Sequence, residues 1–419
     1  MQDEMPSTLA RPRRATPVRS RTGRAAVSGR AARTIRLARL VPASALLLVL
    51  LLGALLPAAR ASAHPAAFTI AGASEAYPLV ALMARRYAAT RPPIAIDVLP
   101  TTGSGFDAAC SGTAAQIGMS NTYISDVQRS RPGCRDLLNL PIALDALCVI
   151  YNLPGAALTQ RTADGFTLAH PLHLSRQVLV NIYAGAVSRW DDPALVALNP
   201  SLALPAQRIA LYDLAEPGSN RPVLDRWLSP PASPGGITTP SEASAPRAAG
   251  VVRLPASGAM VQAIGQTSYS LGYVGLNYAI ANREQVAALR NASGLFQTPS
   301  PTTLRAALNS RLHSGGIALD FRTSLVDVPG HDSYPLTYFE YLLVHRHLGS
   351  LPHADLATRA AIKAFLQWSI HPRGGQALVA QLVMAPVVRP TAPGCTNGFC
   401  PVPDPIAAAL QALIDSIEV

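Results

Sequence analysis

The chain of 419 residues contains a single lysine, Lys363, and only 14% of its residues are charged. Its basic character therefore rests on arginine, which is unevenly distributed. Residues 1–63 contain eleven arginines against Asp3 and Glu4, a net charge of +9, whereas residues 64–419 carry 24 basic and 22 acidic side chains, a net charge of +2. Binding along a nucleic-acid duplex needs basic side chains clustered on the folded surface. No nucleic-acid partner is expected.

Low charge combined with 49% hydrophobic residues excludes disorder for most of the chain. The 37 prolines and 29 glycines indicate many short turns, and Ser229–Arg247 is predicted to be a surface loop. The residues after position 63 are enough for two domains of roughly 150 to 200 residues each.

The N-terminal segment has the pattern of a secretory signal peptide. An arginine-rich stretch precedes the apolar run Leu46–Leu56, which is followed by Pro57 and by Ala61-Ser62-Ala63. This order predicts cleavage after Ala63 and an exported mature chain. The alternative is an uncleaved anchor over Val41–Ala59, although prolines shorten its helical part.

Motifs of common enzymes are also missing. The sequence contains no Gly-x-Ser-x-Gly elbow, no His-Glu-x-x-His pair and no phosphate-loop lysine, so neither catalysis nor a cofactor is expected. His345 and His347 are spaced to share one side of a strand, as half of a metal site would be. Without further ligands nearby, we expect solvated histidines at a strand end and no metal.

Five cysteines suit an exported protein. Cys395 and Cys400 bracket a turn sequence and are expected to form one disulfide, and Cys110 with Cys134 is the next most plausible pair. Cys148 then remains as a free thiol in an apolar run that is typical of a buried strand. A zinc site at Cys395 and Cys400 is a weaker alternative, because no second Cys/His pair stands at a suitable spacing.

Short β-like runs alternate with helical ones. This pattern predicts an α/β fold whose sheets are mostly parallel and covered by helices. Tyr334, Tyr338, Phe339 and Tyr341 indicate a buried strand. The predicted strands are Ala67–Ala71, Ile94–Pro100, Ile117–Ser120, Cys148–Asn152, Val178–Tyr183, Ile209–Tyr212 and Gly272–Leu276, and the predicted helices are Pro78–Thr90, a segment through Cys110, Ala354–Ile370, Gly375–Val383 and Pro405–Ile417.

A set of motifs occurs in one order along residues 65–390. The most specific is Trp190-Asp-Asp-Pro193 with Leu198-Asn-Pro200. The other motifs are Ile70-Ala-Gly-Ala-Ser74, Thr102-Gly-Ser-Gly105, Ile117-Gly-Met-Ser-Asn121, Val149-Ile-Tyr-Asn-Leu-Pro154, Ile182-Tyr-Ala-Gly185, Gly272-Tyr-Val274 and Tyr334-Pro-Leu-Thr337. Their order resembles that of the phosphate-binding component of bacterial phosphate ABC transporters, a periplasmic solute-binding family.

The resemblance implies a two-lobe periplasmic binding protein of type II, the Venus-flytrap arrangement, with the ligand in the cleft. Two hinge crossovers are expected near Leu144–Asn152 and Tyr334–His345. Lobe one would then comprise residues 64–146 and 335–419, and lobe two residues 147–334.

The resemblance also places ligand contacts. Ser74 and Ser104 match hydroxyl contacts of the family, although both residues also fit turns or helix N-caps. Asn121 stands where the family has an aspartate that accepts a proton from hydrogenphosphate; an amide both donates and accepts. The further candidates, from lobe two and from the position beside Ser74, are Glu216, Ser219, Asn220, Arg221 and Glu75.

Two departures from the family pattern concern charge. Leu214 replaces an arginine that would pair with two phosphate oxygens, and Arg221 is then either a substitute cation or a surface side chain. Glu75 adds a carboxylate beside Ser74. Unless Glu75 points to solvent, it disfavours tight binding of inorganic phosphate.

We therefore predict an exported, non-enzymatic and monomeric solute-binding protein. It would capture phosphate or a related small ligand by hinge closure and deliver it to an inner-membrane ABC permease. The alternative is a scaffold or surface-interaction protein that has kept the fold without a small ligand.

Overall fold

The computed structural model describes residues 66–90, 94–101, 105–155, 160–162, 165–167, 171–215, 220–229, 247–388 and 405–419. The predicted signal peptide and the predicted pair Cys395 and Cys400 lie outside these residues, as does most of the predicted loop Ser229–Arg247.

One sheet dominates the fold, in the strand order β2-β1-β3-β14-β4-β10-β8-β9. Its outer strands pair in parallel, whereas β14 pairs antiparallel with β3 and β4, and β10 pairs antiparallel with β4. These strands are β1 (Ala66–Gly72), β2 (Ile94–Pro100), β3 (Ile117–Ser120), β4 (Leu137–Asn152), β8 (Ala210–Leu214), β9 (Val252–Leu254), β10 (Ser270–Gly275) and β14 (Thr337–His345).

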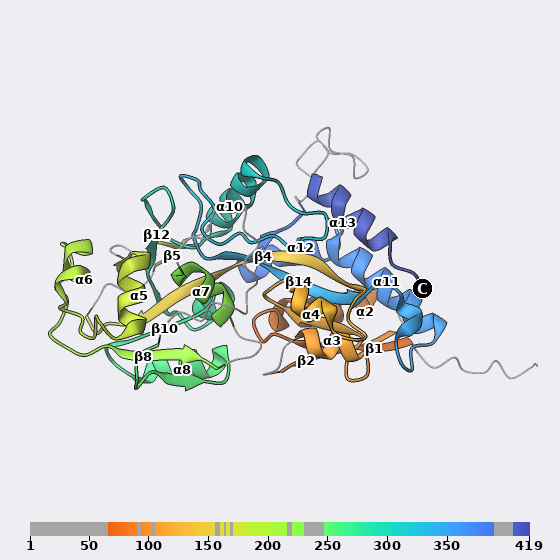
Figure 1. Cartoon of the computed structure of the whole chain (residues 1–419), viewed down its shortest axis with the longest axis horizontal. Coiled ribbons are helices and arrows are strands. Elements are labelled where there is room, and N and C mark those ends of the chain that lie inside the picture. The colour runs from red at the N-terminus through yellow and green to blue at the C-terminus, as the bar shows by residue number, and fades with distance from the viewer. Residues whose placement is uncertain are drawn as a thin grey trace, which may run out of the picture. The chain divides into compact units, whose positions relative to one another are not determined.

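The long strand β4 changes partner along its length. Residues 137–146 pair with β14, and residues 147–152 pair with β10. The change falls between Ala146 and Leu147, where Leu147 N–H donates to the carbonyl oxygen of Leu336 (2.9 Å). Figure 1 shows β4 running between the strands β8 and β10 and the strands β1 and β2. The expected α/β fold with crossover strands is confirmed.

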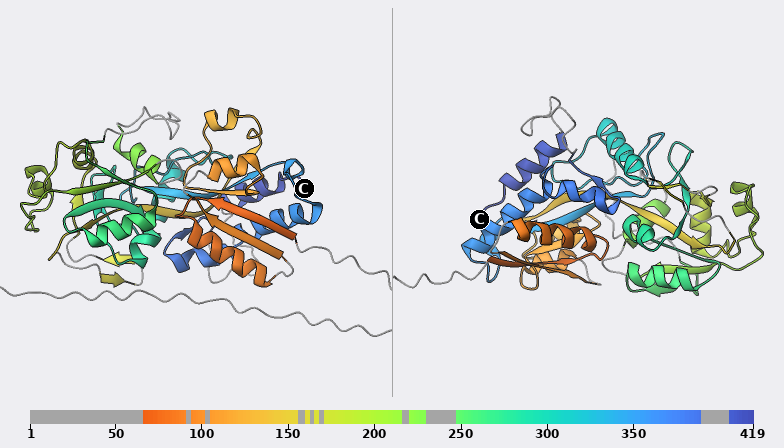
Figure 2. Two further views of the ribbon diagram at one scale, coloured as in Figure 1. Left: turned by 90° about the horizontal axis from the view of Figure 1, so that it is seen from below. Right: turned by 180° about the vertical axis from the view of Figure 1, so that it is seen from behind.

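Helices cover both faces of the sheet, as the two views of Figure 2 show. They lie between the strands along the chain, as expected from the alternation. The helices are α2 (Tyr77–Thr90), α3 (Gly105–Ser111), α4 (Asp126–Ser130), α5 (Arg176–Ala184), α6 (Pro193–Leu198), α7 (Arg221–Leu228), α8 (Ser257–Gln266), α9 (Leu276–Ala281), α10 (Pro301–Ser314), α11 (Leu356–Ile370), α12 (Gln376–Val379) and α13 (Pro405–Asp415), with the short 3-10 helices η1 (Leu348–Ser350) and η2 (Ala380–Leu382).

The remaining strands are short. They form two small sheets, of which one has the order β13-β12-β7 and the other pairs β5 with β6, or they add to β4. They are β5 (Gln160–Thr162), β6 (Gly165–Thr167), β7 (His173–Leu174), β11 (Gln285–Val286), β12 (Ala288–Arg290), β13 (Phe296–Gln297) and β15 (Ala385–Pro386).

Two glycines bring α3 against the sheet. Gly72 ends β1 with φ of 144°, and a Cβ there would lie 2.2 Å from the carbonyl oxygen of Met119. A Cβ on Gly105, the first residue of α3, would lie 1.8 Å from the same oxygen. Only glycine allows this approach of two segments to β3.

The prediction of a strand at Val178–Tyr183 is wrong, because this run belongs to helix α5. Its buried residues Val178, Leu179, Ile182 and Tyr183 recur at helical spacing. Ser175 caps the helix at its N-terminus, and Gly185, with φ of 82°, ends it.

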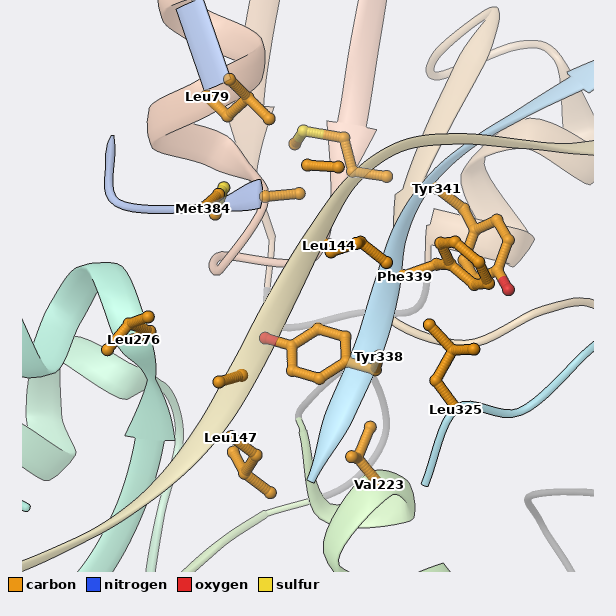
Figure 3. Close-up of a cluster of buried hydrophobic side chains, with 14 of the residues drawn as sticks. Leu79, Leu144, Leu147, Val223, Leu276, Leu325, Tyr338, Phe339, Tyr341 and Met384 are labelled. Carbon is orange, nitrogen blue, oxygen red and sulfur yellow. The ribbon is translucent and has the colours of Figure 1, made fainter. Parts of the chain in front are cut away.

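The crossover strands form the centre of the core. Tyr334, Tyr338, Phe339 and Tyr341 are all buried, as predicted. Figure 3 shows Tyr338 on one side of β14 with its hydroxyl over β4, and Phe339 and Tyr341 on the other side. Because side chains alternate along a strand, Tyr338 and Glu340 share one face of β14.

The cysteine predictions that fall on described residues are confirmed. Cys110 and Cys134 form a disulfide, and Cys148 is a buried free thiol. Within the described residues, no helix is both long and apolar enough to cross a membrane.

Candidate functional site

Glu75 occupies the turn between β1 and α2 and is completely buried. Its carboxylate accepts hydrogen bonds from three neutral side chains: the hydroxyl of Ser74 (3.2 Å), the amide of Asn121 (3.4 Å) and the hydroxyl of Ser257 (2.5 Å). Ser257 is the first residue of α8, 182 positions along the chain. The sequence alone does not decide whether Glu75 points to solvent or into the candidate site. In the structure its side chain points into the candidate site.

The backbone next to Glu75 is held from the same distant segment. Asn277, in α9, donates its amide to the carbonyl oxygen of Glu75 (3.0 Å), and the hydroxyl of Tyr278 donates to the carbonyl oxygen of Ser74 (3.2 Å). Gly275 completes the contact, since a Cβ there would lie 3.4 Å from Cγ of Glu75 and 3.2 Å from Oδ2 of Asp145. The turn that carries Glu75 is thus fixed against residues 257–278.

A chain of polar contacts runs from Glu75 to the crossover strands. The Asn121 amide also donates to the side-chain oxygen of Asn220, and the Asn220 amide donates to the Tyr338 hydroxyl (3.2 Å). That hydroxyl donates in turn to Asp145 (3.0 Å), its cross-strand neighbour on β4. Two predicted ligand residues that are distant in sequence, Asn121 and Asn220, are therefore in direct contact.

Two further carboxyl groups lie buried beside this chain. Burial raises the pKa of Asp145 to about 7, and the negative charge of Glu75 adds to the rise. Burial also raises the pKa of Glu340 well above its ordinary value, with contributions from the charges of Asp145 and Glu75. Neither carboxyl oxygen of Glu340 has a hydrogen-bond partner among the described residues. The cluster therefore gathers three buried carboxyl groups, two of which have a raised pKa.

The predicted substitute cation lies in a different cluster. Arg221 is buried, so the interpretation as a surface side chain is wrong. Its Nε lies 3.5 Å from Asp213 and 3.4 Å from Asp225, and Arg247 binds the same two carboxylates at 3.0 and 2.6 Å. The opposite charges of these two arginines and two aspartates are thus paired with one another.

A small cavity adjoins Asn121 and Tyr338. Its volume is about 30 Å³, and its polar lining includes Arg226, whose guanidinium donates to the Tyr123 hydroxyl (2.9 Å). This volume holds roughly one water molecule.

The predicted site residues separate into three groups. Ser74, Glu75, Asn121 and Asn220 lie together, Arg221 lies in the neighbouring ion-pair cluster, and Ser104, Glu216 and Ser219 fall outside the described residues. Sequence reasoning missed the groups that surround them. Their signal in the sequence is weak, except that Asp145 and Glu340 interrupt strongly apolar strands. The missed residues are Asp145, Ser257, Asn277, Tyr338 and Glu340.

The histidine prediction is half wrong. His347 is exposed and bonds Glu418, but His345 is buried, where its ring nitrogens contact Asp136 (2.7 Å) and the carbonyl oxygen of Ala109 (2.9 Å). A bulge in the pairing between Glu340 and Tyr341 precedes this end of β14. Among the described residues, no group of three His, Cys, Asp or Glu side chains is arranged to hold a metal ion.

Comparison with known proteins gives the family. The profile of the PBP superfamily domain matches residues 58–373, well over half of the chain. The chain belongs to the PBP superfamily. The predicted resemblance to the phosphate-binding proteins is confirmed as well, because several curated proteins that are similar in sequence to this chain are phosphate-binding proteins.

One such relative is the phosphate-binding protein PstS of Methanocaldococcus jannaschii, which is 28% identical over 55% of this chain and is itself covered over 59% of its length. Another, from Xylella fastidiosa, is 26% identical over 76% of this chain and 80% of its own length. Among solved structures, a human phosphate-binding apolipoprotein superposes with a TM-score of 0.57 at 14% identity, over 82% of this chain and 93% of that one. At this identity the likeness shows the fold alone.

Proposed function

We propose that this chain is an exported solute-binding protein that captures phosphate or a related small ligand between two lobes. Lobe one comprises residues 64–146 and 335–419, and lobe two residues 147–334. The protein works as a monomer without catalysis, in the periplasm or after secretion, once the signal peptide is removed near Ala63. Its partner is an inner-membrane ABC permease.

One observation carries the proposal. The side chains of Glu75 and Asn121, which fall in the proposed lobe one, meet those of Asn220 and Ser257, which fall in the proposed lobe two. A ligand held between two lobes has to contact residues of both, and closure over it couples binding to a change that a permease recognises. The proposed contacts are Ser74, Glu75, Ser104, Asn121, Glu216, Ser219, Asn220 and Arg221.

A second candidate function is a scaffold that binds no small ligand. It is favoured by the internal pairing of the site, in which Asn121 and Asn220 bind each other and Glu75 accepts three hydrogen bonds. Side chains that are already satisfied by one another gain less from a ligand.

A stability screen separates the two functions. A ligand that binds only the folded state raises the free energy of unfolding by about 2.7 kcal/mol at 100 times its dissociation constant. The panel contains inorganic phosphate, sulfate, phosphonates, sugar phosphates, and uncharged and cationic solutes. A solute-binding protein gives a concentration-dependent shift with at least one of them. A scaffold gives none, and that result would exclude ligand capture within the panel.

A further inference from the structure

The environment of Glu75 is that of a bound anion. Three neutral donors from three segments converge on its carboxylate, from Ser74, Asn121 and Ser257. A carboxylate excluded from water is stabilised by such donors or by a cation. Among the ion pairs of the described residues, none involves Glu75; Arg221 and Arg247 pair instead with Asp213 and Asp225. The carboxylate therefore relies on neutral donors.

The start of helix α8 adds to this environment. Ser257 is the first residue of this ten-residue helix, whose N-cap residue Ala256 makes no side-chain capping bond. The N-terminus of a helix carries partial positive charge and favours a negative group. The Ser257 hydroxyl that binds Glu75 thus stands where an anion is favoured, and the bond is charge-assisted.

The same contacts join the two proposed lobes. Glu75 binds Ser257 through its side chain and Asn277 through its carbonyl oxygen, 182 and 202 positions away. Asn121 binds both Glu75 and Asn220. A ligand that closes two lobes makes hydrogen bonds to residues of both lobes. Here the Glu75 side chain makes such bonds, to Asn121 and to Ser257.

Resting on the proposed function, we propose that the Glu75 carboxylate is a tethered anion that occupies the donor set between the lobes. It holds the lobes closed without a ligand and excludes phosphate. A phosphate beside it would find these donors already bound to Glu75 and would face the negative charge of the Glu75 carboxylate. Glu75 is thereby the residue that determines which class of ligand the site accepts.

Two measurements test the proposal: isothermal titration with sodium phosphate at neutral pH, and small-angle X-ray scattering with and without phosphate. The variant Glu75→Ala frees the three donors and leaves space beside them. We expect it to bind phosphate at least about 100-fold more tightly than the wild type. We also expect it to scatter as a larger particle without phosphate and as the compact wild-type particle with phosphate.

The matched control is Glu284→Gln, a change at another buried carboxyl whose pKa burial raises to about 7. It should behave as the wild type in both measurements. Should Glu75→Ala fail to fold, Glu75→Ser, which also removes the carboxylate and leaves space beside the donors, is measured under the same criteria.

The outcomes distinguish this inference from the proposed function. If the wild type binds phosphate as tightly as Glu75→Ala, the inference is wrong and ligand capture stands. If the wild type without ligand scatters as an expanded particle, the inference is also wrong. If the Glu75 variants neither bind phosphate nor expand, the inference is wrong whatever the solute panel shows, and the panel alone then decides the proposed function.

Discussion

At the scale of single residues, the hydroxyl of Ser257 decides how well the buried carboxylate of Glu75 is satisfied. Ser257→Ala removes one of its three donors and leaves the rest of the site in place. A buried charged group that loses a hydrogen bond costs about 1–3 kcal/mol. We expect the free energy of unfolding to fall by this amount in urea titrations. Ser111→Ala, which removes an exposed hydroxyl bond to Ala108, is the control and should change it by less than about 0.5 kcal/mol.

The raised pKa of Asp145 predicts a dependence of stability on pH. Its pKa is about 7 in the folded protein against 3.8 ordinarily, so between these values the folded state holds a proton that the unfolded state has lost. The free energy of unfolding therefore falls as pH rises from 4 to 7, by up to about 1.4 kcal/mol per pH unit for each such proton, and levels off above pH 7.

Asp145→Asn should make the fall of the free energy of unfolding with pH less steep, because one titrating group is lost. The contributions of Glu284 and Glu340 to this slope remain. Urea titrations of both proteins at several pH values measure the two slopes. Equal slopes would show that Asp145 is ionised in the folded protein throughout this range.

At the scale of elements, replacing glycine by alanine is expected to destabilise the protein at Gly72 and to stabilise it at Gly265. Gly72→Ala places a Cβ 2.2 Å from the Met119 carbonyl oxygen at a φ of 144°, so we expect a loss of at least about 3 kcal/mol. Gly265→Ala lies in helix α8 with no atom within 4 Å of the new Cβ, and should stabilise by about 0.5–1 kcal/mol. Thermal unfolding of both variants checks the contrast; a mild effect of Gly72→Ala would contradict the close packing of β1 on β3.

The elements also show what the sequence is able to predict. The strands Ile94–Pro100 and Ile117–Ser120 match the prediction residue for residue, because local patterns of apolar residues and turns define them. In α5, β-branched and aromatic residues favour a strand, yet the Ser175 and Gly185 caps and the one-sided burial make a helix. Local composition was the misleading signal there.

The candidate site was predictable only in part, because it depends on contacts between distant positions. Family motifs led to Ser74, Asn121 and Asn220. No local pattern relates Glu75 to Ser257, 182 residues away, or Tyr338 to Asp145, 193 residues away. The pair of Tyr338 and Asp145 is fixed by the pairing of β14 with β4, which depends on the order of strands in the sheet.

At the scale of the whole molecule, the shared strand β4 predicts a single cooperative unfolding transition. Residues 137–146 pair with β14 and residues 147–152 pair with β10, so one continuous strand runs through the sheets of both proposed lobes and is expected to couple their unfolding. In Trp368→Phe the remaining tryptophans, Trp190 and Trp227, are both buried within residues 147–334 and report that part alone.

We therefore expect the fluorescence of Trp368→Phe and its far-UV circular dichroism, which reports all helices and strands, to give the same midpoint in urea. Trp368 is only partly buried at the edge of an aromatic cluster with Tyr87 and Phe365, so its replacement affects the proposed lobe one directly and the proposed lobe two only through the strands and side chains that the two share. Loss of stability in lobe one should consequently lower the midpoint reported by Trp190 and Trp227 as well. Two separate midpoints would mean that β4 connects the proposed lobes without coupling their stability, and closure would then depend on side-chain contacts between them, such as those of Glu75 and Asn121.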